Sequence, residues 1–271
     1  MMHVSPVPNP KHSMSPTHYR LSTRLARHLR STGSQLSEHT LALQVLASPG
    51  LPKGAWANDL LRELLDGRFE RREDGIGLWE WKYTFPARGE AVVVLDVETT
   101  GLSPEHNEII ELAMVRLENG ERTVFERLVN PGVPVPPFIS RLTGIRNEHV
   151  RGAADIYTVL REALPLLEDA TLIIQNAGFD LGFLQPRFKR LGYRLDNPVV
   201  DTIHWARKAL PGLSKRGLDS LAWAFDLGPI NGRHRALGDV ETTLQVAHEM
   251  YYMLTAGRPT STSQVAAARA S

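Results

Sequence analysis

The sequence predicts an α/β domain in which a mixed β-sheet carries helices on both faces, preceded by a small module of helices and a hairpin. The first observation behind this prediction is a continuous apolar run, Val92–Leu95, of the kind found in strands that are buried on both faces. The second is that helical and strand-like patterns alternate after about residue 156, following an initial series of strands. A meander that gives way to alternating helices and strands forms a mixed sheet.

The composition limits the classes to which this protein can belong. The chain has 271 residues, 42% of them hydrophobic, which is enough for one large core or for one domain and a smaller one. The formal net charge of +1 neither favours nor excludes a polyanionic ligand. The absence of cysteine excludes disulfides, thiolate zinc sites and cysteine nucleophiles. No apolar run approaches the roughly 20 residues that span a bilayer, and the start of the chain lacks the apolar segment of a secretory signal. We therefore expect a cytoplasmic protein with no membrane partner.

Residues 1–35 form a basic arm that we expect to be disordered or partly helical. The arm contains no Asp or Glu and is rich in Pro and Ser. Its composition is similar to that of an organelle transit peptide; an arm that tethers nucleic acid and a solvated tail without function are the alternatives. Its Lys and Arg residues are Lys11, Arg20, Arg24, Arg27 and Arg30.

Residues 36–84 have the pattern of a small helix-and-hairpin module. Asp74–Gly75 lies between two extended runs, Phe69–Arg72 and Ile76–Tyr83, and this dipeptide is a hairpin signal. Two helices followed by a basic hairpin is the order of a winged helix, whose hairpin arginines could contact phosphate. The alternative is a packing or protein-docking module with an aromatic core. An apolar stripe at helical spacing consists of Trp56, Leu60, Leu61, Leu64 and Leu65.

The first three strands of the main domain follow a short linker at residues 85–90. Val92–Leu95 is the first strand, and Ile109–Leu117 and Thr123–Val129 are the next two. The turn residues Asn119–Gly120 separate the second from the third, which predicts a hairpin. We therefore expect these strands to form an antiparallel meander.

The rest of the domain alternates helices with strands. The predicted helices are Ile156–Leu167, Asp219–Phe225 and Asp239–Leu254, and the predicted buried strands are Leu172–Ile174 and Val199–Val200. Pro186 lies inside the helix expected after the first of these strands, so we expect that helix to be kinked or split. The domain is expected to span residues 90–255, followed by a disordered tail at residues 256–271.

Two carboxylates end the first buried strand. Asp96 and Glu98 are two residues apart, so both side chains leave the same face of the strand. Two ionised carboxylates side by side raise each other's pKa unless a cation lies between them. Oxygen ligands suit the hard ions Mg²⁺ and Mn²⁺. The turn at Thr99–Gly101 can present backbone amides to a phosphate or sugar. Taken alone, the pair could also be a solvated strand end.

A third carboxylate, Asp180, begins the helix after the next buried strand. It is therefore expected near a second strand end, at the positive pole of a helix dipole. Asn176 could orient a ligand or cap this helix, and capping is the more frequent use of such a residue. Phe179 could stack on a base or fill the core, and we favour the core.

Asp239 supplies the fourth carboxylate at the start of the last helix. His234 lies five residues earlier, and five helical steps would place it on a different face, so we expect it on the preceding loop. A loop histidine beside the attacking water can act as general base. Four carboxylates and a base fit two-metal phosphodiester hydrolysis. Arg233 and Arg235 could neutralise neighbouring phosphates.

These motifs resemble those of the DEDDh exonucleases, a ribonuclease H-like family that includes the proofreading epsilon subunit of bacterial DNA polymerase III. The resemblance covers residues 90–255. Asp96 and Glu98 match the first motif, Asp180 the second, and His234 with Asp239 the third. A histidine five residues before the last aspartate marks the histidine branch of the family.

The resemblance implies a 3′→5′ exonuclease that uses two divalent cations, Mg²⁺ or Mn²⁺, and releases nucleoside monophosphates from single-stranded DNA ends in replication proofreading or repair. It assigns catalysis to His234 and Glu98, metal binding to the four carboxylates, and contact with the terminal nucleotide to Thr99 and Leu102, with Leu102 as an apolar wedge. A DNA polymerase catalytic subunit is an implied partner. The alternatives are an RNA-trimming exoribonuclease and, in another class, a nucleic-acid-binding scaffold with an inactive nuclease fold.

Overall fold

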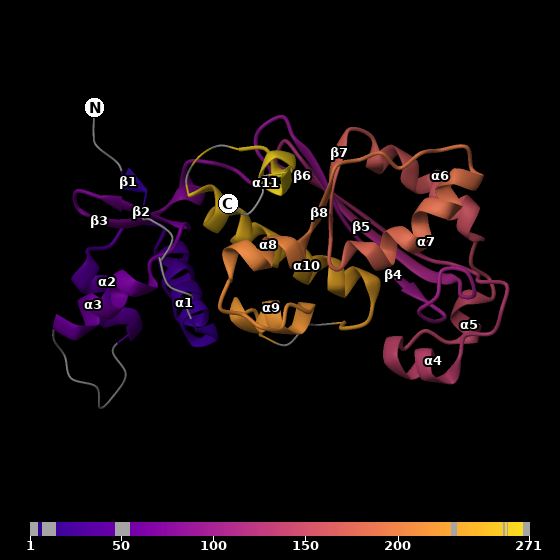
Figure 1. Ribbon diagram of the computed structural model, residues 1–271, viewed down its shortest axis with the longest axis horizontal. Coiled ribbons are helices and arrows are strands. Elements are labelled where there is room, and N and C mark those ends of the chain that lie inside the picture. The colour runs from indigo at the N-terminus through magenta and orange to yellow at the C-terminus, as the bar shows by residue number, and fades with distance from the viewer. Residues whose placement is uncertain are drawn as a thin grey trace.

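The protein has a five-stranded sheet at its centre, with a smaller set of helices and strands at one end (Figure 1). It is described here from a computed structural model. The residues that the structure describes are 5–6, 15–46, 55–228, 232–256, 258 and 260–267.

The central sheet has the strand order β6-β5-β4-β7-β8. Pairing of β4 with β5 and of β5 with β6 is antiparallel, whereas β7 pairs in parallel with β4 and with β8. The predicted meander and mixed sheet are thus confirmed, with the hairpin turn at Asn119–Gly120 between β5 and β6. The strands are β4 (Ala91–Thr99), β5 (Ile109–Glu118), β6 (Glu121–Leu128), β7 (Ala170–Ile174) and β8 (Val199–Asp201).

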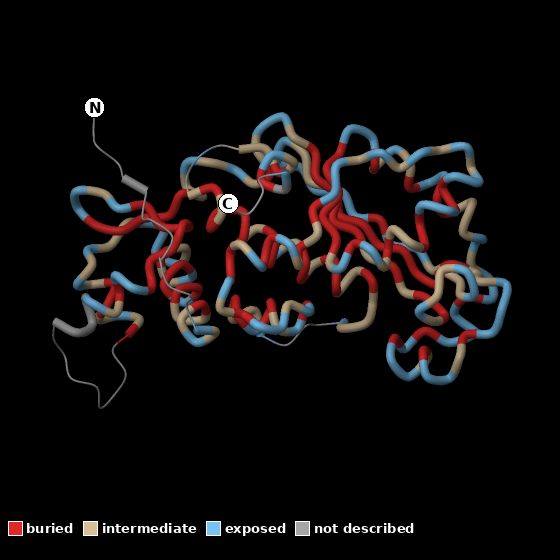
Figure 2. Tube along the Cα trace, viewed as in Figure 1, coloured by how far each residue is buried: buried red, intermediate tan, exposed pale blue. Residues whose placement is uncertain are grey.

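Helices cover both faces of this sheet. Strand β4 shows the reason: Val92 and Val94 belong to one apolar cluster, whereas Val93 and Leu95 belong to another on the opposite face. Helices α6 and α7 contribute to the second cluster and α8, α9 and α10 to the first, and the strands are buried between them (Figure 2). The helices are α4 (Pro137–Thr143), α5 (Asn147–Val150), α6 (Ile156–Leu167), α7 (Ala177–Arg190), α8 (Thr202–Ala209), α9 (Leu218–Ala224), α10 (Ala236–Thr255) and α11 (Thr262–Ala267).

Of the two outcomes expected from Pro186, a kinked or a split helix, the split is wrong. Helix α7 runs without interruption over Ala177–Arg190 with Pro186 inside it. Pro186 lies on the exposed side of the helix, where water can reach the backbone groups that a proline leaves unpaired. The neighbouring Arg187 also donates a hydrogen bond from Nη1 to the carbonyl of Phe183 at 2.8 Å.

The basic arm was expected to be disordered or partly helical, and residues 16–32 are helical; residues 1–4 and 7–14 of the arm lie outside the described residues. The helical residues form α1 (Pro16–Thr32), with Ser15 as N-cap and Gly33 in the left-handed conformation at its end. Sequence inspection overlooked the second face of this segment, where small and apolar side chains recur at helical spacing. Its buried residues are Tyr19, Ser22, Thr23, Leu25, Ala26 and Leu29.

In its described residues, the N-terminal end of the molecule contains three helices and a small antiparallel sheet. The hairpin is present as β2 and β3, but β3 ends at Leu78, so the strand expected to continue to Tyr83 is wrong. Trp79–Trp81 instead forms a 3₁₀ turn, because the amides of Lys82 and Tyr83 bond to the carbonyl of Trp79. The winged-helix interpretation stays a prediction. The elements are β1 (Ser5–Pro6), α1, α2 (Glu38–Leu46), α3 (Ala55–Leu64), β2 (Phe69–Arg72), β3 (Gly75–Leu78) and η1 (Trp79–Trp81).

The arginines of the hairpin are paired with carboxylates. Arg71 pairs with Glu38, and Arg72 donates to Glu70 at 2.5 Å. The basic character of the hairpin suggests that these arginines contact phosphate. Each arginine would have to leave its carboxylate partner to do so.

A buried ion network attaches this end of the molecule to α10. Arg68 is 1% exposed and contacts Asp66 at 2.6 Å and Glu249 of α10 at 2.8 Å. Its guanidinium also donates to the hydroxyls of Ser22 and Thr23 on α1. Buried charges of this kind are costly to separate, so these residues join the N-terminal elements to the sheet domain.

The C-terminal segment departs from the expectation of disorder. Residues 262–267 form α11, and Thr262 donates from its amide and its hydroxyl to the carboxylate of Glu90. The side-chain and amide bonds to Glu90 fasten the start of α11 beside β4. Within the described part of the chain, every helix is too short or too polar to cross a membrane.

Candidate active site

The first two carboxylates lie at the end of the central strand β4. Asp96 and Glu98 are partly exposed, whereas Val97 between them is buried, so both carboxylates leave the same face. The amide of Val97 donates to Oδ1 of Asp180 at 3.0 Å. This hydrogen bond brings the first turn of α7 to the same strand end, so three of the four predicted carboxylates meet there.

The start of α7 explains the position of Asp180. The Asp180 side chain is buried, at 2% exposure, one turn into the helix. Asn176 is exposed at the N-cap with left-handed backbone (φ 60°, ψ 54°), and its side chain makes no capping hydrogen bond. The predicted capping role is therefore wrong; Asp201 instead accepts from the amide of Ala177 at 3.2 Å. The Asn176 side chain is left free of helix capping and faces solvent.

The other two predicted site residues come from the start of α10. Asp239 lies in the first turn of α10, and His234 lies in the turn before it, with φ 61°. Loop placement of the histidine agrees with the prediction. Ligand atoms of Glu98, His234 and Asp239 all lie within 4.8 Å of one another. The structure thus brings the third motif to the first, across the sheet face.

The acidic residues of the site share a raised pKa. Burial raises the pKa of Asp96 well above its ordinary range, and the charges of Asp180 and Glu98 act in the same direction. Burial also raises the pKa of Glu98 to about 8, of Asp180 to about 7 and of Asp239 to about 6. The Asp-x-Glu pattern predicted the repulsion between Asp96 and Glu98, which adds to the effect of burial, and a bound cation would relieve it.

The donor set fits a divalent cation. Oδ1 of Asp239 is buried and has no hydrogen-bond partner among the described residues, although buried carboxylate oxygens are nearly always satisfied. Carboxylate oxygens beside one imidazole are ligands for hard or borderline cations. Asp96, Glu98, Asp180 and Asp239 could therefore hold such ions, with His234 beside them.

Arg233 and Arg235 flank His234 and bind different carboxylates. Arg233 donates to Asp239 at 2.5 Å, whereas Arg235 donates to Glu111 at 2.5 Å. Both were expected as neighbours of phosphate, and the structure instead shows each paired within the protein. Burial, followed by the charge of Arg233, lowers the pKa of His234, which keeps the imidazole neutral at neutral pH.

Glu111 is a residue of the site that sequence inspection missed. It lies on β5 directly opposite Glu98 and is fully buried. Its Oε2 accepts from the amide of Ala236 at 2.8 Å, the first residue of α10. Glu111 therefore fixes the start of the helix that carries Asp239. The signal available in the sequence was a lone carboxylate within the apolar run Ile109–Leu117.

The residues expected at the substrate end take up different environments. Leu102 is 84% exposed, an unusual state for a large apolar side chain on the turn after β4. The hydroxyl of Thr99 donates to the carbonyl of Gly101 at 2.6 Å, which closes that turn. Phe179 is partly buried, with its ring 5.1 Å from that of Phe183. Packing against the core agrees with the interpretation that we favoured for Phe179.

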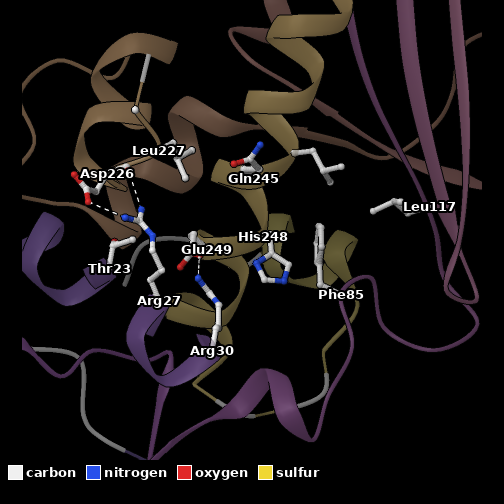
Figure 3. Close-up of a pocket in the computed structure, with 12 residues that line it drawn as sticks. Thr23, Arg27, Arg30, Phe85, Leu117, Asp226, Leu227, Gln245, His248 and Glu249 are labelled. Carbon is white, nitrogen blue, oxygen red and sulfur yellow. Dashed lines mark hydrogen bonds and ion pairs between the residues drawn. The ribbon is translucent and has the colours of Figure 1, made fainter. Parts of the chain in front are cut away.

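A separate pocket of about 660 Å³ is lined in part by residues of α1 and α10 and by none of the candidate site residues. Its arginines already have partners: Arg27 donates to Asp226 and Arg30 to Glu249 (Figure 3). The pocket therefore lacks a free cationic group of the kind that binds phosphate. Its remaining lining residues are Thr23, Phe85, Leu117, Leu227, Gly228, Leu244, Gln245 and His248.

Comparison with known families decides the classification of this site. A model of an exonuclease family, RNase_T, matches residues 93–247, more than half of the chain. The chain belongs to this exonuclease family. The match begins within β4 and ends within α10, so it includes all five residues that the motifs identified.

Curated proteins similar to this chain include DNA polymerases. The chain is 39% identical over 173 residues to the PolC-type DNA polymerase III of Halalkalibacterium halodurans, and 36% identical over 179 residues to that of Caldanaerobacter subterraneus subsp. tengcongensis. These alignments cover 63% and 66% of this chain but 12% and 13% of the polymerases. The chain thus spans about an eighth of the length of these relatives.

A solved structure of exonuclease I has the same fold. The TM-score is 0.51 at 22% sequence identity, and the superposition covers 63% of this chain and 42% of the other. The likeness confirms the ribonuclease H-like mixed sheet with flanking helices.

Proposed function

We propose that this protein is a metal-dependent 3′→5′ exonuclease that removes nucleoside monophosphates from single-stranded DNA ends, in replication proofreading or repair. One observation carries the proposal: carboxylates from β4, α7 and α10 converge beside His234. DNA is favoured over RNA because the curated relatives at 36–39% identity are DNA polymerases. Association with a polymerase catalytic subunit belongs to the same proposal.

The four carboxylates would hold two divalent cations, Mg²⁺ or Mn²⁺. Such ions would stabilise the negative charge that develops on the phosphodiester and lower the pKa of water. Asp96 and Glu98 supply ligands from β4, whereas Asp180 and Asp239 supply them from the first turns of two helices. The positive end of each helix favours the ionised carboxylate, which is the form that binds a cation.

His234 would take the proton of the attacking water. The pKa of this imidazole is lowered, first by burial and then by the charge of Arg233, so the form that can accept a proton prevails at neutral pH. Its place on a turn rather than on α10 leaves the ring free to approach the carboxylates.

The terminal nucleotide would contact the turn after β4. The exposed Leu102 offers an apolar surface against the last base, and Thr99 lies between it and Glu98. Asn176 and Phe179, at the start of α7, would complete the substrate contacts. An apolar wedge favours an unpaired end, because it competes with stacking of the base in a duplex.

The test is degradation of single-stranded DNA and RNA of one sequence, labelled at the 3′ or the 5′ end, with Mg²⁺, Mn²⁺ or EDTA. Asp96→Ala should abolish cleavage, and the matched control Asp196→Ala, an exposed aspartate, should not. Cation-dependent shortening of DNA from the 3′ end would support the proposal. Preference for RNA would replace DNA by RNA as the substrate. Binding without cleavage would favour a scaffold with an inactive nuclease fold, and full activity of Asp96→Ala would refute the metal site.

A further inference from the structure

Arg233 bridges a buried and an exposed carboxylate at the edge of the candidate site. Its Nη1 donates to Oδ2 of Asp239 at 2.5 Å, and its Nε donates to Oδ1 of Asp219 at 2.9 Å. The Asp239 side chain is 7% exposed, whereas that of Asp219 is 70% exposed. The same guanidinium therefore has one partner inside the site and one at the surface, on the first turn of α9.

The same Nη1 also restricts the chemistry of His234. It lies 3.1 Å from Nδ1 of the imidazole. A guanidinium can only donate hydrogen bonds, so Nδ1 is the acceptor, and the neutral ring then carries its proton on Nε2. The lone pair of Nδ1 is used by Arg233 in this arrangement, and the ring cannot take a proton from water until Nη1 withdraws.

Arg233 opposes the binding of a cation at Asp239 through its charge. Oδ2 of Asp239 accepts from the guanidinium, while Oδ1 is buried without a partner among the described residues. Two cationic groups at one buried carboxylate repel each other strongly because the local dielectric is low. The guanidinium would then favour the exposed carboxylate of Asp219, which it already contacts, and would need no new partner.

We propose that Arg233 is a latch on the metal site, which holds Asp239 and Nδ1 of His234 together and moves onto Asp219 when a divalent cation binds Asp239. The inference rests on the proposed function, since it requires Asp239 to be a metal ligand. The latch couples two events: binding of the cation releases the lone pair that His234 needs as general base. It is a positioning residue, because it acts through Asp239 and His234.

The test is Mn²⁺ affinity, measured from the electron paramagnetic resonance signal of the free ion with no nucleic acid present. Arg233→Gln removes the competing charge and should tighten Mn²⁺ binding about tenfold or more, as expected for loss of a hydrogen-bonded ion pair that the cation has to break. Arg122→Gln is the matched control: Arg122 pairs with Glu241 on an exposed part of α10 and should leave the Mn²⁺ affinity at the wild-type value.

A double-mutant cycle with Asp219 separates the latch from a general charge effect. Asp219→Asn removes the second partner, so displacement of Arg233 becomes harder and Mn²⁺ should bind more weakly than to the wild type. The same substitution in the Arg233→Gln background should have little effect. Asp219 is largely exposed, so this variant is expected to fold.

The outcomes distinguish failure of the latch from failure of the proposed function. Equal or weaker Mn²⁺ binding by Arg233→Gln, with the wild type still binding Mn²⁺, would overturn the latch alone. An effect of Asp219→Asn that is the same in both backgrounds would also overturn it. No Mn²⁺ binding by either the wild type or Arg233→Gln would overturn the metal site together with the latch.

Discussion

Replacing Glu98 by glutamine should stabilise the protein against unfolding at pH 8 in the absence of divalent cations. Burial raises the pKa of Glu98 from 4.5 to about 8 in the folded chain, whereas the unfolded chain ionises near the ordinary value. A raised folded pKa means that stability is fully present below pH 4.5 and is lost as the pH rises toward 8. Glutamine has nearly the same shape and does not ionise, so it removes this loss.

The size of the effect follows from the difference between the two pKa values. Each pKa unit corresponds to about 1.4 kcal/mol, so the raised pKa of Glu98 lowers the unfolding free energy by about 3 kcal/mol at pH 7 and by about 4 kcal/mol at pH 8. These are upper limits, because Glu98 is partly exposed and solvent screens its charge. Asp96, Asp180 and Asp239 also have raised pKa values, so the variant should retain part of the pH dependence.

The assay is urea unfolding of wild type and Glu98→Gln at pH 5 and pH 8, in EDTA. The wild type should lose unfolding free energy between these two pH values, and the variant should lose less. Glu162→Gln, which changes an exposed carboxylate on α6, is the control and should follow the wild type. Equal pH dependence of wild type and Glu98→Gln would refute the reasoning that this carboxylate is costly to ionise in the folded chain.

Three other side chains give predictions that separate catalysis from stability. His234→Ala should lower the cleavage rate about 10²–10⁴-fold. The pKa of His234 is lowered from 6.5, so the wild-type rate should rise with pH in the range below pH 6.5. The variant should lack this rise. Glu111→Gln weakens the buried partner of Arg235 and of the first amide of α10, so unfolding free energy should fall by about 1.5–3 kcal/mol; unchanged stability would exclude Glu111 as the anchor of α10. Arg68→Ala leaves Asp66 without its buried counter-ion and should cost about 3–5 kcal/mol, contradicted by an unfolding midpoint equal to that of the wild type.

Local sequence patterns predicted the sheet because two of its central strands, β4 and β7, contain continuous apolar runs. Val92–Leu95 is buried on both faces of the sheet, as a continuous apolar run predicts. The turn at Asn119–Gly120 requires a positive φ at both residues, and Asn-Gly is a dipeptide that adopts this conformation readily. Helix α8, by contrast, was not among the predicted helices.

Environment overrode local pattern in two places. Pro186 predicted a break in α7, yet the helix continues because this residue lies on the exposed side. The aromatic residues Trp79, Trp81 and Tyr83 alternate as in a strand, yet they belong to a 3₁₀ turn and the residues after it. The hydroxyl of Tyr252 on α10 donates to the carbonyl of Tyr83 at 2.5 Å, a contact between residues far apart in the chain.

The sequence by itself determined how the candidate site residues are placed relative to their neighbours in the chain. Spacing of two along a strand places Asp96 and Glu98 on one face, and the five-residue separation of His234 from Asp239 places the histidine on a turn. These are local relations, and backbone geometry alone settles them.

Only the tertiary structure decided how these groups are held. Glu111 meets the start of α10 across 125 positions of the chain, and Arg68 meets Glu249 across 181. Arg233 has Asp219 and Asp239 as its two partners because α9 and α10 pack side by side. The partner of a charged side chain depends on distance and burial in the folded molecule. Neither quantity can be read from the order of the residues.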